Sequence, residues 1–246
     1  MRTRRFEQLR PEELAREREK NSLVYLPVGL LEWHSYAMPM GTDAIVAEKA
    51  CLLAAKLTGG VVLPTLYCAP ALIREDGLKA MESAYSCTKS VFFSQELFQG
   101  MIDRYLHAMA EQGYKKILIV VGHGSAGFTD VIDKICKNFE SESDSKAAII
   151  HAWATQDIAP YSLGHATIIE TSLMMYLTDS VELKKLPPEP EPLFCRKMGM
   201  DDPAANPDGT VNEVDDPRRA TVELGKKIFD RGIINIVGFV NGEDFD

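Results

Sequence analysis

The sequence predicts an α/β fold built on a largely parallel sheet. Short apolar runs of β type alternate along the chain with longer segments of amphipathic helical periodicity, and this order is typical of parallel strands joined by helices. The run Ile117–Val121 is entirely apolar, as expected for a strand in the middle of such a sheet. A length of 246 residues is routine for one α/β domain, so we expect a single domain over residues 1–246.

Each predicted strand is a short apolar run, and each predicted helix repeats apolar residues every three or four positions. In chain order, the expected strands are Ser22–Val28, Gly60–Leu63, Ile117–Val121, Ala147–Trp153 and Ile233–Val237. The expected helices are Asp43–Leu57, Thr88–Gln112, Gly127–Phe139, Ala166–Thr178 and Pro217–Arg231. Two stretches break the alternation: Ala69–Cys87 is expected to form a loop near the site, and Lys184–Asp216, rich in Pro, Asp and Asn, is predicted to be a long irregular excursion.

The composition excludes several classes of protein. Apolar residues make up 46% and charged residues 26%, as in ordinary globular domains, so the chain is neither fibrous nor disordered. Lys and Arg number 27 against 36 Asp and Glu, and a net charge of −9 without a basic block argues against a nucleic-acid or anionic-membrane partner. No apolar run approaches the roughly 20 residues that span a bilayer, and no signal peptide is visible. The five scattered cysteines indicate reduced thiols and a cytoplasmic location.

Histidines and carboxylates follow the predicted strands at the points where ligands gather in open α/β sheets. They are Glu32, His34 and Asp43 after the first strand, His123 after the central strand, and His165 and Glu170 at the start of the fourth helix. Histidine and carboxylate together suit Zn²⁺, Mn²⁺ or Fe²⁺, and carboxylates shared between two ions are the usual basis of a binuclear hydrolytic site. The pattern therefore predicts a site for divalent metal ions.

Taken singly, most of these residues have a simpler explanation. The loop residues fit solvated surface positions, and the residues at helix starts fit capping positions favoured by the helix dipole. His123 is the exception, because glycines flank it directly after a buried strand, and such a loop favours close backbone approach to a ligand. It is the joint pattern that points to a metal site.

The motifs that hold these residues resemble those of the creatininase (creatinine amidohydrolase) family. In chain order they are Leu26-Pro27-Val28-Gly29 with Glu32-x-His34, Pro39-x-Gly41-Thr42-Asp43, Val121-Gly122-His123-Gly124, His165 with Glu170-Thr171-Ser172, and Asp216-Pro217-Arg218-Arg219-Ala220-Thr221 with Glu223-x-Gly225. They follow the order of the family and extend over most of the chain. The first motif is the most specific of them.

This resemblance implies a three-layer α/β/α sandwich, a two-metal hydrolytic site and a closed homo-oligomer, often a hexamer. Carried over position by position, it assigns as metal ligands Glu32, His34, Asp43 and His123, with Asp43 bridging the ions. Creatininase itself has a further carboxylate ligand where this chain has Ser125, and Glu170 is the expected substitute. His165 matches the histidine that carries a proton, a task suited to the one side chain that changes charge near neutral pH.

The implied reaction is hydrolysis of a C–N bond in a small cyclic amide or formamide by metal-activated water. Three departures argue against creatinine itself. Ser35-Tyr36-Ala37 follows His34 in place of Gly-Pro-His, and Tyr85-Ser86-Cys87-Thr88 replaces Phe-Pro-Gly-Thr. The tryptophans that cover the substrate in creatininase are not evident between Thr155 and Gly164. Tyr36 and Ser125 are expected to contact the substrate. Other branches of the family include a formamidopyrimidine deformylase, a peptide-trimming enzyme of mycofactocin maturation and a hydrolase that opens the C–C bond of a cyclic inositol-derived diketone, and the sequence does not choose among them.

Three other functions stay open at this stage. Gly122–Gly127 spells Gly-x-Gly-x-x-Gly between a strand and a helix, as in a dinucleotide-binding turn, and Asp157 lies near the end of the next strand at a spacing longer than the usual ~20 residues. Ser125 could serve a serine hydrolase, although the first glycine of the nucleophile elbow is missing. A non-catalytic relative would keep the fold and lose metal ligands, and none of the five expected ligands is lost.

Overall fold

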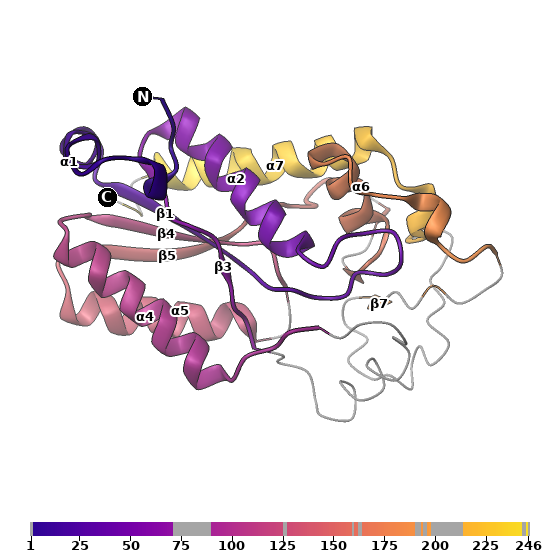
Figure 1. Ribbon diagram of the computed structural model, residues 1–246, viewed down its shortest axis with the longest axis horizontal. Coiled ribbons are helices and arrows are strands. Elements are labelled where there is room, and N and C mark those ends of the chain that lie inside the picture. Colours follow the sequence, from indigo (N-terminus) through magenta and orange to yellow (C-terminus); the bar gives the residue numbers. More distant parts are fainter. Residues whose placement is uncertain are drawn as a thin grey trace.

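The centre of the molecule is a parallel sheet (Figure 1). The computed structural model describes residues 2–70, 90–124, 127–158, 160–161, 164–189, 193, 196–197, 214–242 and 245. The sheet has the order β2-β1-β4-β5, with β3 also paired to β1, and every one of these pairings is parallel. Its strands are β1 (Leu23–Gly29), β2 (Val61–Val62), β3 (Leu66–Tyr67), β4 (Lys116–Val121) and β5 (Lys146–His151).

Strand β1 divides the core into two parts because successive side chains of a strand point to opposite faces. Leu23 and Tyr25 belong to one hydrophobic cluster, and Val24, Leu26 and Val28 belong to the other. All seven residues of β1 are buried, as expected for a central parallel strand covered on both faces.

Helices cover both faces of the sheet, which confirms the predicted three-layer α/β/α sandwich (Figure 1). One layer contains α2 (Thr42–Thr58), α6 (Ile168–Leu177) and α7 (Val222–Val240). The opposite layer contains α4 (Gln95–Glu111) and α5 (Phe128–Glu142), and α1 (Pro11–Lys20) lies near the N-terminus at the end of the sheet away from α6. The short elements are the 3-10 turns Phe6–Gln8, Leu183–Lys185 and Pro217–Arg219 and the antiparallel pair β6 (Gly164–His165) and β7 (Arg196–Lys197).

The predicted last strand, Ile233–Val237, is wrong, because these residues lie inside α7. A short apolar run is compatible with either a buried strand or a buried helix. The wider pattern is helical: Leu224, Ile228, Ile236 and Val240 are buried, whereas Ile234 is 60% exposed. The apolar stripe of α7 packs on the layer formed with α2 and α6.

Helices α4 and α7 begin several residues later than predicted, each directly after a residue that caps it. The Ser94 hydroxyl accepts the Leu97 amide before α4, and the Thr221 hydroxyl accepts the Leu224 amide before α7. Upstream of α4, Val91 instead forms an isolated antiparallel bridge with Leu31. Helix α1 was not predicted, because none of its residues is buried and it carries no apolar stripe.

Parts of two expected loops lie outside the described residues. Of the loop Ala69–Cys87, residues 69 and 70 are described, and most of the interior of the excursion Lys184–Asp216 is not. No helix within the described part of the chain combines the length and the hydropathy needed to cross a membrane.

Candidate metal centre

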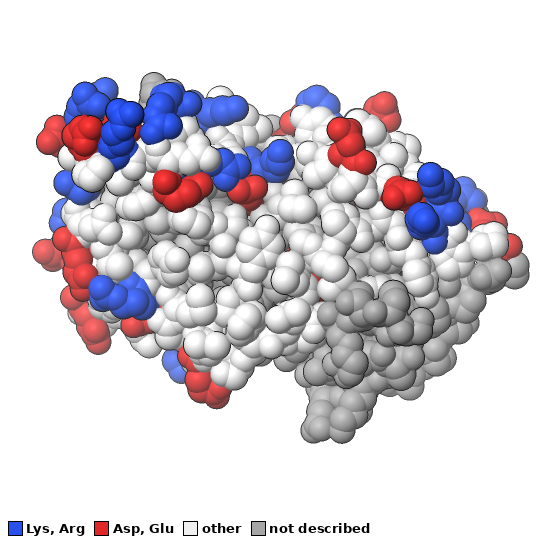
Figure 2. All heavy atoms as spheres, in the orientation of Figure 1, with Lys and Arg blue, Asp and Glu red and all other residues white. Residues whose placement is uncertain are grey.

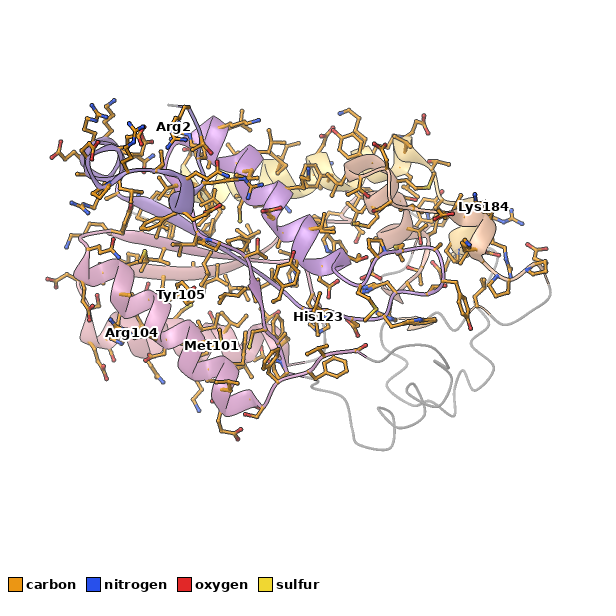
Figure 3. The ribbon with its side chains drawn as sticks, in the orientation of Figure 1. Arg2, Met101, Arg104, Tyr105, His123 and Lys184 are labelled. Atoms are coloured by element: carbon orange, nitrogen blue, oxygen red, sulfur yellow. The ribbon has the colours of Figure 1, made fainter. Side chains whose placement is uncertain are left out.

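Three histidines and three carboxylates meet at the carboxyl end of the parallel sheet, and we call them the histidine–carboxylate cluster. Its members are Glu32, His34, Asp43, His123, His165 and Glu170. They come from the loop after β1, the first turn of α2, the turn after β4 and the segment from β6 into α6. Figure 3 shows His123 at the end of the sheet, close to the start of α2. Strand ends and helix starts distant in sequence thus converge as the topology predicts.

The start of α2 is seated directly on the ends of two strands. A Cβ atom on Gly29, the last residue of β1, would lie 2.3 Å from the backbone nitrogen of Ala44. A Cβ atom on Gly122, directly after β4, would lie 2.0 Å from the carbonyl oxygen of Asp43. Both glycines are therefore needed for the close approach that places Asp43 beside His123.

The carboxylate of Asp43 lies between two histidines, one at each oxygen. His34 Nε2 lies 3.1 Å from Asp43 Oδ1, and His123 Nδ1 lies 3.1 Å from Asp43 Oδ2. Glu32 adds an oxygen 3.2 Å from His123 Nδ1, and Glu170 adds one 3.7 Å from His34 Nε2. The side chains of Glu32, His34 and Asp43 are at most 3% exposed.

These contacts define two candidate metal-binding triads that share one residue. The first is Glu32, Asp43 and His123, and the second is His34, Asp43 and Glu170. In each triad the ligand atoms lie within 4.8 Å of one another. A carboxylate common to two such sets is the arrangement expected of a residue that bridges two ions.

Unpartnered polar atoms test whether the cluster fits metal ions. Glu32 Oε2 and His34 Nε2 are buried, and although they lie 3.2 Å from His123 Nδ1 and 3.1 Å from Asp43 Oδ1, neither contact has the geometry of a hydrogen bond. A buried polar atom without a partner is costly, and a carboxylate oxygen and an imidazole nitrogen are the donor atoms that Zn²⁺ and Mn²⁺ accept. The residues present therefore fit divalent ions.

At Glu32, His34, Asp43 and His123, charge within the cluster opposes the effect of burial on the pKa. Burial raises the pKa of the Glu32 carboxyl, but the charges on His165 and His123 hold it below its ordinary value. Burial acts in the same direction on Asp43, and His34 and His123 likewise hold its pKa low. Burial lowers the pKa of His123, but Glu32 and Asp43 raise it to about 10, and Asp43 and Glu170 raise the pKa of His34 well above its ordinary value. The buried carboxylates of Glu32 and Asp43 are thus stabilised by positive charge on the neighbouring histidines.

Backbone groups orient the side chains of the cluster. His34 Nδ1 donates to the carbonyl oxygen of Glu32 at 3.0 Å, and His165 Nε2 donates to the carbonyl oxygen of Trp33 at 2.7 Å. The amide of Ala166, which has a positive φ of 56°, donates to Glu170 Oε2 at 2.5 Å. Such contacts fix the ring orientation and the free nitrogen of a metal-binding histidine.

The structure brings together all five predicted metal ligands and His165. Tyr36 lies close by, 38% exposed, with its ring edge-on to Trp33 at 5.4 Å between centroids, and its predicted contact with substrate stays a prediction. Ser125 lies outside the described residues. Sequence reasoning missed the support that the Trp153 indole gives to the His123 turn by donating to the Gly122 carbonyl at 3.3 Å. It also missed the backbone groups named above, for which a sequence carries no direct signal.

The dinucleotide alternative is weakened by the same geometry. His123, inside the Gly122–Gly127 motif, points into the cluster and contacts Asp43. Asp157 forms an ion pair with Arg231 at 3.4 Å on the surface.

A three-layer fold with a buried histidine–carboxylate cluster at the carboxyl edge of its sheet is the arrangement expected of a metal-dependent hydrolase. The family model Creatininase, described as creatinine amidohydrolase, matches residues 7–240, so the chain belongs to the creatininase family of hydrolases.

Individual relatives agree with this assignment. A creatinine amidohydrolase of Pseudomonas putida is 24% identical over an alignment of 247 positions that covers 91% of each chain. The crystal structure of a creatinine amidohydrolase (creatininase) matches with a TM-score of 0.76 at 21% identity, over 100% of this chain and 99% of that one. A structure described as creatininase Mn matches with a TM-score of 0.74 at 23% identity, over 99% of both chains.

Proposed function

We propose that the chain is a binuclear metal-dependent amidohydrolase that cleaves a C–N bond of a small cyclic amide or formamide. The observation that carries the proposal is the pair of candidate triads that share Asp43. Membership of an amide-hydrolysing family supports the reaction type.

The ions are two per chain and are Zn²⁺, Mn²⁺ or Fe²⁺. Mixed imidazole and carboxylate ligands suit all three metals, and a relative is described as a manganese form. When bound, such ions lower the pKa of water toward neutrality and polarise a carbonyl group. Glu32 and His123 would hold one ion, His34 and Glu170 would hold the other, and Asp43 would hold both.

The remaining residues bind substrate and manage the proton. Trp33 and the half-exposed ring of Tyr36 lie on the side of the cluster formed by the loop after β1, where Tyr36 would contact the substrate. Ser125 is proposed as a second substrate contact. At His165 the nitrogen that faces the cluster is Nδ1, because Nε2 is held by the Trp33 carbonyl, so a proton carried by this ring would pass through Nδ1.

The first test is the metal content of untagged protein purified without added metal, measured by elemental mass spectrometry. We expect about two equivalents of Zn, Mn or Fe per chain. The variant Asp43→Ala should lose both, because it removes the shared ligand. His107→Gln, a change on the surface of α4, is the matched control and should keep both. Absence of metal that persists after reconstitution, or full metal content in Asp43→Ala, would contradict the proposal.

Substrate class is tested on the same protein. We expect the metal-loaded enzyme to hydrolyse a member of a panel of cyclic amides and formamides, with cyclic diketones included to detect C–C cleavage. Activity should be lost on chelation and restored by metal. If the protein hydrolyses only the diketones, the binuclear centre stands and the assignment to amide hydrolysis is wrong.

We also propose a cytoplasmic homo-oligomer, with a hexamer as the expected assembly. Cys51, Cys68 and Cys136 are free and buried, which suits a reducing compartment. Figure 2 shows charged side chains mainly toward the edges of one face and a broad uncharged middle, and large apolar side chains such as Tyr67, Val91 and Leu97 are exposed. Light scattering in solution tests the assembly, and a monomer at all concentrations would contradict it.

A further inference from the structure

The short segment 90–93, which leads into α4, lies against the loop after β1. The amide of Val91 donates to the carbonyl of Leu31 at 2.8 Å, and the two residues form an isolated antiparallel bridge. The half-buried Ser90 adds a side-chain contact, because its hydroxyl oxygen accepts the amide of Trp33 at 3.0 Å. The backbone bond at Val91 does not depend on the Ser90 side chain, so a change at Ser90 can remove the hydroxyl contact alone.

The amide that Ser90 holds shares a planar peptide group with the carbonyl of Glu32. That carbonyl accepts a hydrogen bond from His34 Nδ1 at 3.0 Å. Because the atoms of a peptide group turn as one unit, a partner that holds the Trp33 N–H also holds the direction of the Glu32 carbonyl. Ser90 therefore acts, through one peptide group, on the atom that orients the His34 ring.

The peptide groups on either side of this one are held as well. The preceding group carries the Glu32 amide, which donates to the carbonyl of Met40 at 2.9 Å. The following group carries the Trp33 carbonyl, which accepts His165 Nε2 at 2.7 Å. The middle group has a serine hydroxyl at one end and an imidazole at the other, so the two hydrogen bonds polarise the same peptide group and strengthen each other.

We propose that Ser90 is a positioning residue of the metal centre: its hydroxyl oxygen sets the direction of the Glu32–Trp33 peptide group and thereby the direction in which His34 faces its ion. The inference deepens the proposed function and rests on its binuclear centre, in which His34 is a ligand. Contacts behind a ligating histidine orient the ring, and their loss typically costs about 10–100-fold in metal affinity. Ser90 extends that support by one peptide group.

The test compares metal binding by the purified protein and its Ser90→Ala variant. Competition with a chromophoric chelator should show that one of the two ions binds about tenfold more weakly in Ser90→Ala, the lower end of the range for such contacts, because Ser90 acts one peptide group away from the ring. The visible absorption of the Co²⁺-loaded protein, which reports ligand geometry, should change as well. Ser90→Thr keeps the hydroxyl group and should restore both the affinity and the spectrum.

Ser94→Ala is the matched control. The Ser94 hydroxyl also accepts a backbone amide, that of Leu97 at 3.2 Å, at the start of α4. Its removal should lower the stability of the protein through loss of a helix cap, and it should leave both affinities and the Co²⁺ spectrum unchanged. A merely structural role for Ser90 predicts this same result for Ser90→Ala.

Circular dichroism before metal addition establishes that each variant is folded. If Ser90→Ala does not fold, Ser90→Cys takes its place. The thiol is similar in shape to the hydroxyl group and is a weak acceptor, so one ion should again bind more weakly.

The outcomes separate this inference from the proposed function. If the unaltered chain binds no metal, the proposed function fails and the role of Ser90 fails with it. If the unaltered chain binds two ions and Ser90→Ala binds them with the same affinities and the same Co²⁺ spectrum, the positioning role is overturned and the binuclear centre stands. A loss of affinity that Ser90→Thr does not restore, or that Ser94→Ala shows equally, would come from disturbed packing and would also overturn the inference.

Discussion

At the scale of single residues, the cluster balances charge in two different ways. Without metal, the buried carboxylates of Glu32 and Asp43 are compensated by protonated histidines, which explains the raised pKa values of His34 and His123. With metal, the same rings must be neutral because a ligating nitrogen needs its lone pair. Metal and protons therefore compete for His34 and His123.

This competition predicts opposite pH dependences for the two forms. The pKa of His123 is raised to about 10 from an ordinary value near 6.5, so its contribution to the stability of the metal-free protein is complete below about pH 6.5 and is lost as the pH rises toward 10. The pKa of Asp43 is lowered in the folded protein, so this group stabilises the fold fully above its ordinary pKa, and the contribution is lost as the pH falls from that value through the lowered one. The metal-loaded protein should instead gain stability over its metal-free form as the pH rises, because fewer protons compete for the ligands.

Denaturant unfolding from pH 6 to 9, with and without chelator, measures both trends. Metal-free His123→Gln is the control and should lack the part of the decline that is due to this ring. A metal-free protein with constant stability over this range would show that His123 is not charged in the absence of metal.

At the scale of elements, helix α7 shows where sequence patterns suffice and where they do not. Its N-terminal half is predicted from periodicity, but the pattern also predicts a strand at Ile233–Val237, because four apolar residues among five satisfy either period. The deciding contacts are long-range. A Cβ on Gly225 would lie 1.8 Å from the Ser172 carbonyl oxygen in α6, so the two helices touch backbone to backbone there. No local pattern reveals that approach.

The two glycines Gly225 and Gly238 of α7 make a matched test of this packing. Gly225→Ala should destabilise the protein by about 1–3 kcal/mol or more, because the added methyl group meets the backbone of α6, which cannot move like a flexible side chain. At Gly238 an added Cβ meets nothing within 4 Å, and Gly238→Ala should stabilise the protein by roughly 0.5–1 kcal/mol through helix propensity. Urea denaturation monitored by circular dichroism measures both. Equal stabilities for the two variants would mean that α6 and α7 are not in backbone contact in solution.

At the scale of the whole molecule, the sequence predicts the layers of the fold and the location of the histidine–carboxylate cluster. It does not predict how the ligands are arranged within the cluster. Alternating strands and helices were enough to predict that Glu32, Asp43 and His123 would meet at the carboxyl edge of the sheet, since parallel strands all end there. The division of ligands into triads depends on which oxygen of Asp43 faces which histidine, and on backbone carbonyls in the loop after β1. These features result from packing across the sheet, and a residue pattern carries no information about that packing.

Because the candidate ligands come from distant segments of the chain, bound metal should stabilise the whole fold. The candidate ligands join the ends of β1 and β4 to the starts of α2 and α6, and no set of neighbouring residues in the unfolded chain reproduces that arrangement. A ligand that binds only the folded state stabilises it by about 2.7 kcal/mol at a free concentration of 100 times its dissociation constant. For a chain of this length, that corresponds to a rise in Tm of roughly 5–10 °C per site.

Chelation should therefore lower the Tm of the unaltered protein by this amount or more, as measured by differential scanning calorimetry, and readdition of Zn²⁺ or Mn²⁺ should restore it. Asp43→Ala should melt at the same temperature with and without chelator, because the shared ligand is gone. A chelator effect that persists in Asp43→Ala would place the stabilising metal outside the histidine–carboxylate cluster.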